Sequence, residues 1–249
     1  MATHGSLFSG IGGFDLAAQN AGFENVWNCE NDEFCQKVLR KNFPNTYQYS
    51  NILDLQNPPY VDIISGGFPC QDISDAKTYT TDEANAIDGI NGSRSGLWFE
   101  MCRIIGEVRP KFVIIENVSA LTKKGLDQVL QSLAEIGYDS EWTIITAARF
   151  GAPHLRKRIW IVAYPNSIGR QESLILGKVF EQKVRQSSQW ELSRTICKET
   201  RKKTLPGTYG IHDGIPQRVD DARRMKAIGN SIVPQIATAI FEVIKGNYF

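Results

Sequence analysis

The sequence predicts an α/β fold built on a doubly wound sheet, and three observations support this. Short apolar runs that are typical of buried strands alternate along the chain with segments of helical spacing. A glycine-rich turn follows the first run and opens a helix. Polar residues follow several other runs, at the positions where open α/β sheets place their chemistry. A chain of 249 residues is long enough for such a sheet with one small additional region.

The expected elements follow from these patterns in order. We expect strands at Thr3–Phe8, Val26–Cys29, Val61–Ser65, Phe112–Ile115, Trp142–Ala147 and Arg158–Ala163. Helices are expected directly after the glycine turn and at Phe34–Arg40, Leu97–Val108, Leu126–Ile136 and Ile232–Ile244. Residues 76–95, rich in Thr, Asp, Asn and Gly, are expected to form a loop, and residues 168–205 show no clean period.

The first predicted strand runs into the turn Ser9-Gly10-Ile11-Gly12-Gly13. Glycine lets the backbone approach a ligand because it has no Cβ. Glu30 ends the next strand, where its carboxylate can accept both hydroxyls of a ribose. The glycines alone would also suit an ordinary tight turn, but together with Glu30 they predict a nucleotide-binding turn.

A cysteine lies where another predicted strand ends. Cys70 follows Pro69 in the segment GGFPCQDISD, directly after the apolar run YVDIIS. Proline fixes the local φ, so the thiol is held at the carboxyl end of a strand, which suits a nucleophile. A buried, inert cysteine is the alternative for an isolated Pro-Cys pair, and the neighbouring motifs favour the nucleophile.

Three further motifs accompany this cysteine. Glu116 and Asn117 follow the apolar run KFVII at the same edge of the predicted sheet, where a carboxyl can hold a proton. Arg156 and Arg158 alternate around the start of the last predicted strand and so point the same way, although a solvated strand edge would also tolerate them. Residues 227–237, AIGNSIVPQIA, form a glycine turn before the C-terminal helix.

These five motifs, in this order, resemble those of the C5 cytosine-specific DNA methyltransferases. The resemblance covers residues 6–162 and again residues 225–249, with a dissimilar stretch between them. It implies the Rossmann-like sheet of S-adenosylmethionine-dependent methyltransferases with a small target-recognition insert. It also implies a catalytic and cofactor-binding domain at 1–165, a target-recognition region at 166–221, and a segment at 222–249 that returns to the catalytic domain.

The resemblance implies a role for each matching residue. Cys70 would be the nucleophile, and Glu116 would meet N3 of the target cytosine. Asn117 would brace the site, while Arg156 and Arg158 would hold the flipped base and the backbone. The residues implied to bind S-adenosylmethionine are Phe8, Gly10, Ile11, Gly12, Gly13, Glu30, Asn31, Asn51, Ile52, Pro69, Leu97, Asn230 and Ser231. Those implied to contact DNA are Gln71, Ser74, Arg94, His154, Lys202 and Lys203.

The chain departs from the family pattern at three places. His154 stands where the arginine motif usually begins with glutamine, so a contact there would titrate near neutral pH. Asn51 stands where the family usually has an aspartate near the end of its third strand, with Asp54 as an alternative register, and its amide oxygen can still accept a hydrogen bond from adenine. The arginine-rich motif that often precedes the final turn is not clear, and residues 214–226 are the candidate substitute.

Charge and cysteine content fit a cytosolic protein that binds a polyanion. The formal net charge of +1 hides an asymmetry, because residues 1–148 carry 19 acidic and 10 basic side chains, whereas residues 149–249 carry 8 and 18. Double-stranded DNA is therefore expected to meet the C-terminal part. The five cysteines lack metal-ligand spacing and are expected to be reduced. Neither a signal peptide nor a membrane-spanning run is apparent, and we expect a monomer.

Three other interpretations were compared with this one. A transfer RNA cytosine methyltransferase of the same fold typically carries a Cys-Phe-Thr triplet, which does not occur here. A non-catalytic DNA-binding relative would be expected to lack Cys70 or Glu116, whereas this chain has both. The segment NPPY at residues 57–60 resembles an amino-methyltransferase motif, but it precedes the strand that leads to Cys70 and suits a turn. The sequence leaves open the target site and whether a restriction endonuclease is a partner.

Overall fold

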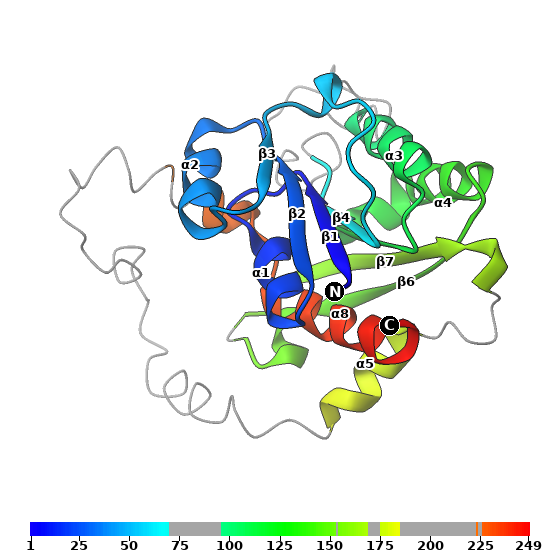
Figure 1. The fold of residues 1–249 in the computed structure, drawn as a ribbon. Coiled ribbons are helices and arrows are strands. Elements are labelled where there is room, and N and C mark those ends of the chain that lie inside the picture. Colours follow the sequence, from blue (N-terminus) through cyan, green and yellow to red (C-terminus); the bar gives the residue numbers. More distant parts are fainter. Residues whose placement is uncertain (70–95, 153, 169–174, 185–222, 224–225) are drawn as a thin grey trace, which may run out of the picture.

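The computed structural model describes residues 1–69, 96–152, 154–168, 175–184, 223 and 226–249 (Figure 1). The described residues form a seven-stranded sheet in the order β3-β2-β1-β4-β5-β7-β6. Its strands are β1 (Thr3–Leu7), β2 (Glu24–Cys29), β3 (Tyr47–Tyr49), β4 (Ile63–Gly66), β5 (Phe112–Val118), β6 (Tyr138–Thr146) and β7 (Lys157–Pro165). Strands β1 to β5 pair in parallel, whereas β7 pairs antiparallel with both β5 and β6. The predicted doubly wound α/β sheet is confirmed.

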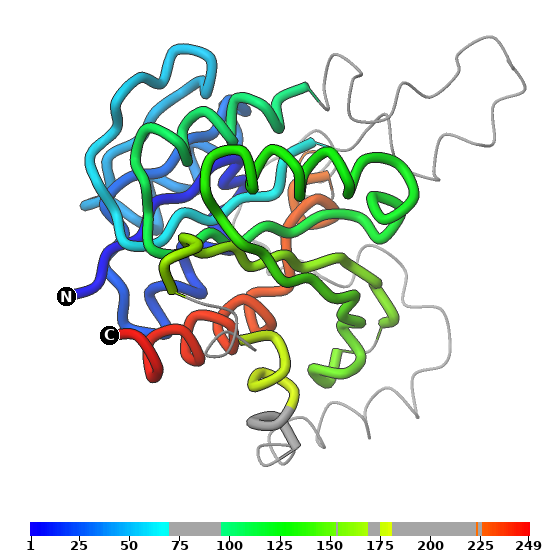
Figure 2. Tube along the Cα trace, turned by 90° about the vertical axis from the view of Figure 1, so that its right-hand side faces the viewer, coloured from blue at the N-terminus to red at the C-terminus, as the bar shows by residue number. Residues whose placement is uncertain are grey.

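Helices cover both faces of this sheet (Figure 2). One face carries α1 (Gly13–Asn20), α5 (Ile175–Val184) and α8 (Pro234–Tyr248), which share one buried apolar cluster. The other face carries α3 (Leu97–Val108) and α4 (Leu126–Glu135), which share the second cluster. Helix α2 (Glu33–Asn42) follows β2, and short 3-10 helices occupy Ile52–Asp54, Ser119–Lys123, Ala147–Phe150 and Asn166–Ile168.

The central strands are apolar because both of their faces are covered. In β5, Val113 and Ile115 join the cluster under α3 and α4, whereas Phe112 and Ile114 join the cluster under α1 and α8. Successive side chains of a strand point to opposite faces, so a continuous apolar run is the expected pattern for a strand between two helical layers. This burial makes the sheet a rigid base for the loops at its edge.

The sheet order brings the functional loops together. Strand β1 has β2 on one side and β4 on the other, so the loops after β1 and β4 leave in different directions and a crevice opens between them. Strand β7 runs antiparallel to β5, with Arg158 opposite Val118, so the start of β7 lies beside the end of β5. Arginines near the start of β7 therefore reach the edge of the sheet at which the parallel strands end.

One strand and one α-helix were not among the expected elements. Strand β3 has only three residues, and α5 lies within the stretch 168–205 that shows no clean period. Glu141 on β6 accepts hydrogen bonds from the backbone N–H groups of Ile175 and Leu176 at the start of α5, at 2.8 and 3.3 Å. Helix α5 therefore packs on the sheet as part of the core, while the predicted domain limits at 165 and 221 stay predictions.

The C-terminal segment Lys226–Tyr248 differs from the expectation that no run is long enough to span a membrane. It has 23 residues, and an 18-residue window within it has a mean hydropathy of 1.4, which meets that criterion by length and composition alone. Within it, Ile236, Ile240 and Ile244 are buried against the sheet and α1. An apolar helix of this kind is also what the core of an α/β protein contains, and one such helix is weak support for a membrane span.

Candidate functional site

A cavity of about 720 Å³ opens at the carboxyl ends of β1, β2, β4 and β5. Its lining includes Glu30 and Phe34 as well as Glu116, Arg156 and Arg158. The residues that line it are Phe8, Gly10, Glu30, Asn31, Asp32, Glu33, Phe34, Cys35, Gly67, Phe68, Pro69, Glu116, Asn117, Val118, Arg156, Arg158, Arg223, Lys226, Ala227, Gly229 and Asn230. The loops after four strands and the turn before α8 therefore meet around one space.

The glycine turn is shaped by residues with positive φ. Phe8, Gly10 and Gly12 have φ values of 54°, 55° and 87°. A Cβ at Gly10 would meet no protein atom within 4 Å, so the backbone is open to the cavity there. A Cβ at Gly12 would instead collide with the ring of Phe43, so this glycine is required by packing. The non-glycine residue Phe8 in this conformation is unusual, and such residues cluster at functional sites.

Glu30 connects the glycine turn to the start of α2. Its Oε2 accepts a hydrogen bond from the Gly10 N–H at 2.7 Å, and its Oε1 accepts one from the Asp32 N–H at 2.8 Å. Asp32 in turn caps α2 by accepting from the Phe34 and Cys35 N–H groups at 2.9 and 3.1 Å. Those backbone hydrogen bonds hold the pKa of Asp32 below its ordinary value. Each Glu30 oxygen keeps acceptor capacity for a ligand hydroxyl.

Glu116 is a buried carboxyl beside an arginine. Its Oε1 lies 3.0 Å from Arg158 Nε, yet within the described structure this oxygen has no hydrogen bond of acceptable angle. Burial raises the pKa of Glu116 to about 7, and Arg158 and Arg156 oppose that rise. At this distance the two groups form an ion pair, and a small rotation of either side chain would complete the hydrogen bond. The carboxyl is therefore ready to exchange a proton near neutral pH.

Asn117 connects β5 to the loop that leads to Cys70. Its Nδ2 donates to the Phe68 carbonyl oxygen at 3.3 Å, and its Oδ1 accepts from the Val118 N–H at 2.7 Å. Gly67 lies against Glu116, since a Cβ there would stand 3.4 Å from Glu116 Oε2. The segment before Cys70 is thereby fixed against Glu116 and Asn117, and Pro69, the last described residue before the cysteine, lines the cavity.

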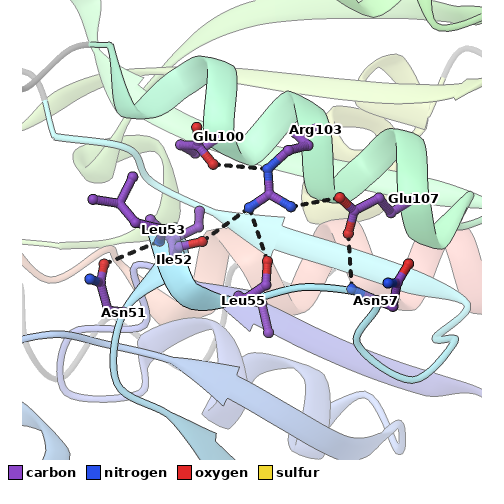
Figure 3. Close-up of polar contacts among 8 residues, drawn as sticks. All are labelled: Asn51, Ile52, Leu53, Leu55, Asn57, Glu100, Arg103 and Glu107. Atoms are coloured by element: carbon purple, nitrogen blue, oxygen red, sulfur yellow. Dashed lines mark hydrogen bonds and ion pairs between the residues drawn. The ribbon is translucent and has the colours of Figure 1, made fainter.

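The segment that carries Asn51 is held against α3 by hydrogen bonds (Figure 3). Asn51 Oδ1 accepts from the Leu53 N–H at 3.1 Å, and its Nδ2 donates to Asp54 Oδ2 at 3.1 Å. Arg103 on α3 donates to the carbonyl oxygens of Ile52 and Leu55 at 3.2 and 2.9 Å. Asn51 does not belong to the cavity lining, so its contact with a cofactor stays a prediction.

The structure brings together about half of the predicted site residues. Those at the cavity are Phe8, Gly10, Glu30, Asn31, Pro69, Glu116, Asn117, Arg156, Arg158 and Asn230. Those described but outside the lining are Ile11, Gly12, Gly13, Asn51, Ile52, Leu97, His154 and Ser231. Gly13 begins α1, Leu97 begins α3, Ile52 is buried in the core, and His154 is exposed. Cys70, Gln71, Ser74, Arg94, Lys202 and Lys203 lie outside the described residues.

Several lining residues were missed in the sequence. Asp32 could have been found, because an aspartate just before an amphipathic helix is a helix N-cap signal. Phe34 and Cys35 face the cavity only because that helix begins at its rim. Arg223 and Lys226 come from the chain before α8, and no local pattern shows that they return to Glu30 and Asp32. Among the described residues, no cluster of His, Cys, Asp or Glu could hold a metal ion.

Comparisons with known proteins agree on a single family. The family model for C-5 cytosine-specific DNA methylase matches residues 2–205. The type II methyltransferase M.NgoPII of Neisseria gonorrhoeae is 31% identical over 213 residues, which cover 81% of this chain and 60% of that protein. M2.BsuMI of Bacillus subtilis is 34% identical over 166 residues, covering 64% of this chain and 41% of that protein. The chain thus spans about half the length of the curated relatives that it matches.

Solved structures show the same fold. A candidate DNA modification methyltransferase encoded within an E. coli prophage is 26% identical, with a TM-score of 0.55, and the match covers 68% of this chain and 48% of that one. Spodoptera frugiperda DNMT2 is 23% identical, with a TM-score of 0.53 and coverage of 68% and 51%. The latter likeness concerns the fold alone. The matched family model and the relatives together establish that the chain belongs to the family of C-5 cytosine-specific DNA methylases.

Proposed function

We propose that this chain transfers a methyl group from S-adenosylmethionine to C5 of a flipped-out cytosine in double-stranded DNA, with Cys70 as the nucleophile. The observation that carries the proposal is the buried Glu116–Arg158 pair, which shares one cavity with the glycine turn. A carboxyl with a pKa of about 7 can remain neutral at physiological pH and donate a hydrogen bond to a ring nitrogen. The membership of a family of DNA methylases supports DNA as the substrate.

The cavity residues fit S-adenosylmethionine as the methyl donor. The open backbone at Gly10 leaves room for a ligand, and Glu30 Oε2 lies at the same turn, where it accepts from the Gly10 N–H. Phe8, Asn31, Pro69 and Asn230 would complete the cofactor wall. When bound there, S-adenosylmethionine supplies an electrophilic methyl group. The residues that would hold it therefore come from the ends of β1, β2 and β4 and from the turn before α8.

The chemistry assigns complementary tasks to Cys70 and Glu116. C5 of cytosine is a weak nucleophile until a group adds to C6, and the Cys70 thiolate would make that bond. Neutral Glu116 would donate a hydrogen bond or proton to N3, which draws electron density from the ring and stabilises the adduct. After C5 has accepted the methyl group, it loses its proton and Cys70 leaves. The base must first leave the duplex stack, at a cost of a few kcal/mol.

The test is mass spectrometry of nucleosides after incubation with S-adenosylmethionine and unmethylated double-stranded DNA, with transfer RNA as a parallel substrate. We expect 5-methyl-2′-deoxycytidine in the DNA and no modification of the transfer RNA. Cys70→Ala and Glu116→Gln should abolish the product, because they remove the nucleophile and the proton donor. Glu242→Gln, which changes an exposed carboxylate on α8, should leave it unchanged. N4-methylcytosine, N6-methyladenine or a product in transfer RNA alone would contradict the proposal.

A further inference from the structure

Arg156 uses its guanidinium group to hold a distant part of the backbone. Its Nη1 donates to the Gly229 carbonyl oxygen at 2.8 Å, and its Nη2 donates to the Ser231 carbonyl oxygen at 2.7 Å. These partners lie 73 and 75 residues further along the chain. Within the described structure, the buried Nε of Arg156 has no hydrogen-bond partner. The two outer nitrogens of the planar fork thus match two carbonyl groups of a single turn.

The 229–231 turn that Arg156 holds is the end of the short helical segment 226–230 that precedes α8, and it reaches both the cavity and the glycine turn. Gly229 and Asn230 line the cavity. On the other side, a Cβ at Gly13 would lie 3.2 Å from Ser231 Oγ and 2.7 Å from Ile232 Cγ1, so the chain beyond the turn is packed against the start of α1. The turn is therefore held between the glycine turn of the N-terminal half and Arg156 at the start of β7.

Arg158, two residues away, contacts a different group. Its Nε lies 3.0 Å from the Glu116 carboxylate, and its Nη1 donates to the Lys157 carbonyl oxygen at 2.9 Å. The alternation of the two arginines predicts that they point the same way, and the family resemblance implies that both hold the flipped base and the backbone. Because both Nη atoms of Arg156 are engaged with backbone carbonyl groups, whereas Arg158 pairs with the carboxylate, the two side chains are suited to different tasks.

We propose that Arg156 is a positioning residue that fixes the 229–231 turn against the cavity for cofactor binding, rather than a residue that contacts the flipped base. The identity of the ligand rests on the proposed function. Loss of the two hydrogen bonds would free the turn, and Asn230 would no longer be held at the cavity wall. The expected consequence is weaker cofactor binding without a change in DNA affinity.

The test compares the wild-type chain with Arg156→Ala, Arg156→Lys and Arg158→Gln. Calorimetry measures the Kd for S-adenosylhomocysteine without DNA, and hydrogen exchange measures protection of the peptide that contains residues 226–233. Arg156→Ala should raise the Kd about tenfold or more, as expected for the loss of two hydrogen bonds from a charged donor, and should speed exchange in that peptide. Arg156→Lys, which keeps the charge but not the fork, should give an intermediate Kd.

The matched control is Arg158→Gln, which should keep the wild-type Kd and exchange while methyl transfer is lost. A wild-type Kd and wild-type exchange in Arg156→Ala, together with weaker DNA binding, would overturn the proposal and favour a base contact. If Arg156→Ala does not fold, Arg156→Lys decides by the same two measurements. If the wild type itself does not bind S-adenosylhomocysteine, the proposed function fails, whereas the exchange measurement still tests the role of Arg156.

Discussion

Two opposing effects set the pKa of Glu116. Burial favours the neutral form of the carboxyl, and two arginines favour its charged form. Burial has the larger effect, so the pKa rises from the ordinary value of 4.5 to about 7. A carboxyl that donates to N3 needs this balance, because complete ionisation would leave no proton and loss of the arginines would leave a buried charge without a partner. Arg158 therefore keeps the proton exchangeable as well as orienting the carboxyl.

This balance makes the stability of the protein depend on pH in a defined direction. Since the folded state favours neutral Glu116, its stabilising contribution is complete below pH 4.5 and is lost as the pH rises to about 7. Burial also raises the pKa values of Asp15 and Glu141 to about 7, so they act in the same window. Urea denaturation of Glu116→Gln should show a smaller decline in the free energy of unfolding across this window, by about 1 to 3 kcal/mol.

The control for this measurement is Glu242→Gln, which removes an exposed carboxylate. Its free energy of unfolding should decline with pH as that of the wild type does. His4, whose pKa burial lowers to about 4, changes stability in the opposite direction, but it is present in all three proteins and cancels in the comparison. A Glu116→Gln protein whose stability declines in parallel with the wild type would show that Glu116 has an ordinary pKa.

Among the elements, α3 is joined to the segment between β3 and β4 by a compact polar network (Figure 3). Arg103 pairs with Glu100 at 2.9 Å and with Glu107 at 2.6 Å on the same helix. Glu107 then accepts a hydrogen bond from the Asn57 N–H at 3.0 Å. The network holds the segment that carries Ile52, a residue of the apolar cluster beneath the cavity.

Replacing Arg103 should therefore destabilise the protein more than the loss of a surface ion pair. Arg103→Leu would leave the carbonyl groups of Ile52 and Leu55 without this donor, and we expect a loss of about 1 to 3 kcal/mol in the free energy of unfolding. Glu100→Gln removes only the ion pair between Glu100 and Arg103 on the same helix. It should lower the free energy of unfolding by about 0.5 kcal/mol or less. Equal effects of the two substitutions in urea denaturation would refute the role assigned to the network.

The elements that the sequence predicts correctly are those with a strong local pattern. The runs that form β4 and β5 are buried on both faces and end at glycine or polar residues, so their positions can be predicted from the sequence. Strand β3 is too short to show a period. Helix α5 owes its place to Glu141 on β6 and to packing against α8, both of which are tertiary contacts.

The same distinction holds for the candidate site. Glu30 and Glu116 were predictable because each ends an apolar strand, and parallel strands end at a common edge. The partners of Arg156 were not predictable, since they lie more than 70 residues away and are backbone atoms. Asn51 was placed by motif alignment, whereas the structure shows its side chain capping a 3-10 helix. Local patterns identify positions at a sheet edge, but they do not determine which groups pair there.

For the whole molecule, the cavity joins two parts of opposite charge. The acidic N-terminal part supplies Glu30, Asp32 and Glu33, and the basic C-terminal part supplies Arg156, Arg158, Arg223 and Lys226. Lys226 helps to lower the pKa of Asp32 across this cavity. A cofactor held by the acidic side and a polyanion attracted by the basic side would meet at Glu116.

One rival nucleophile lies in the same cavity. Cys35 is part of its lining, but burial raises the pKa of its thiol to about 12, so it stays protonated at physiological pH. Cys29 is also buried and its pKa is likewise raised to about 12. Neither thiol suits a nucleophile, which supports the proposal of Cys70, and Cys35→Ala is the matched control for Cys70→Ala.

The measurement that tests the central claim most directly is covalent trapping on double-stranded DNA that contains 5-fluorocytosine. The reaction contains S-adenosylmethionine, and peptide mass mapping locates the adduct. Fluorine cannot leave C5 as a proton does, so the enzyme should remain attached to C6. We predict one adduct, on the peptide that contains Cys70, in the wild type and in Cys35→Ala, and no adduct in Cys70→Ala. An adduct on another cysteine, or one that persists in Cys70→Ala, would contradict the account.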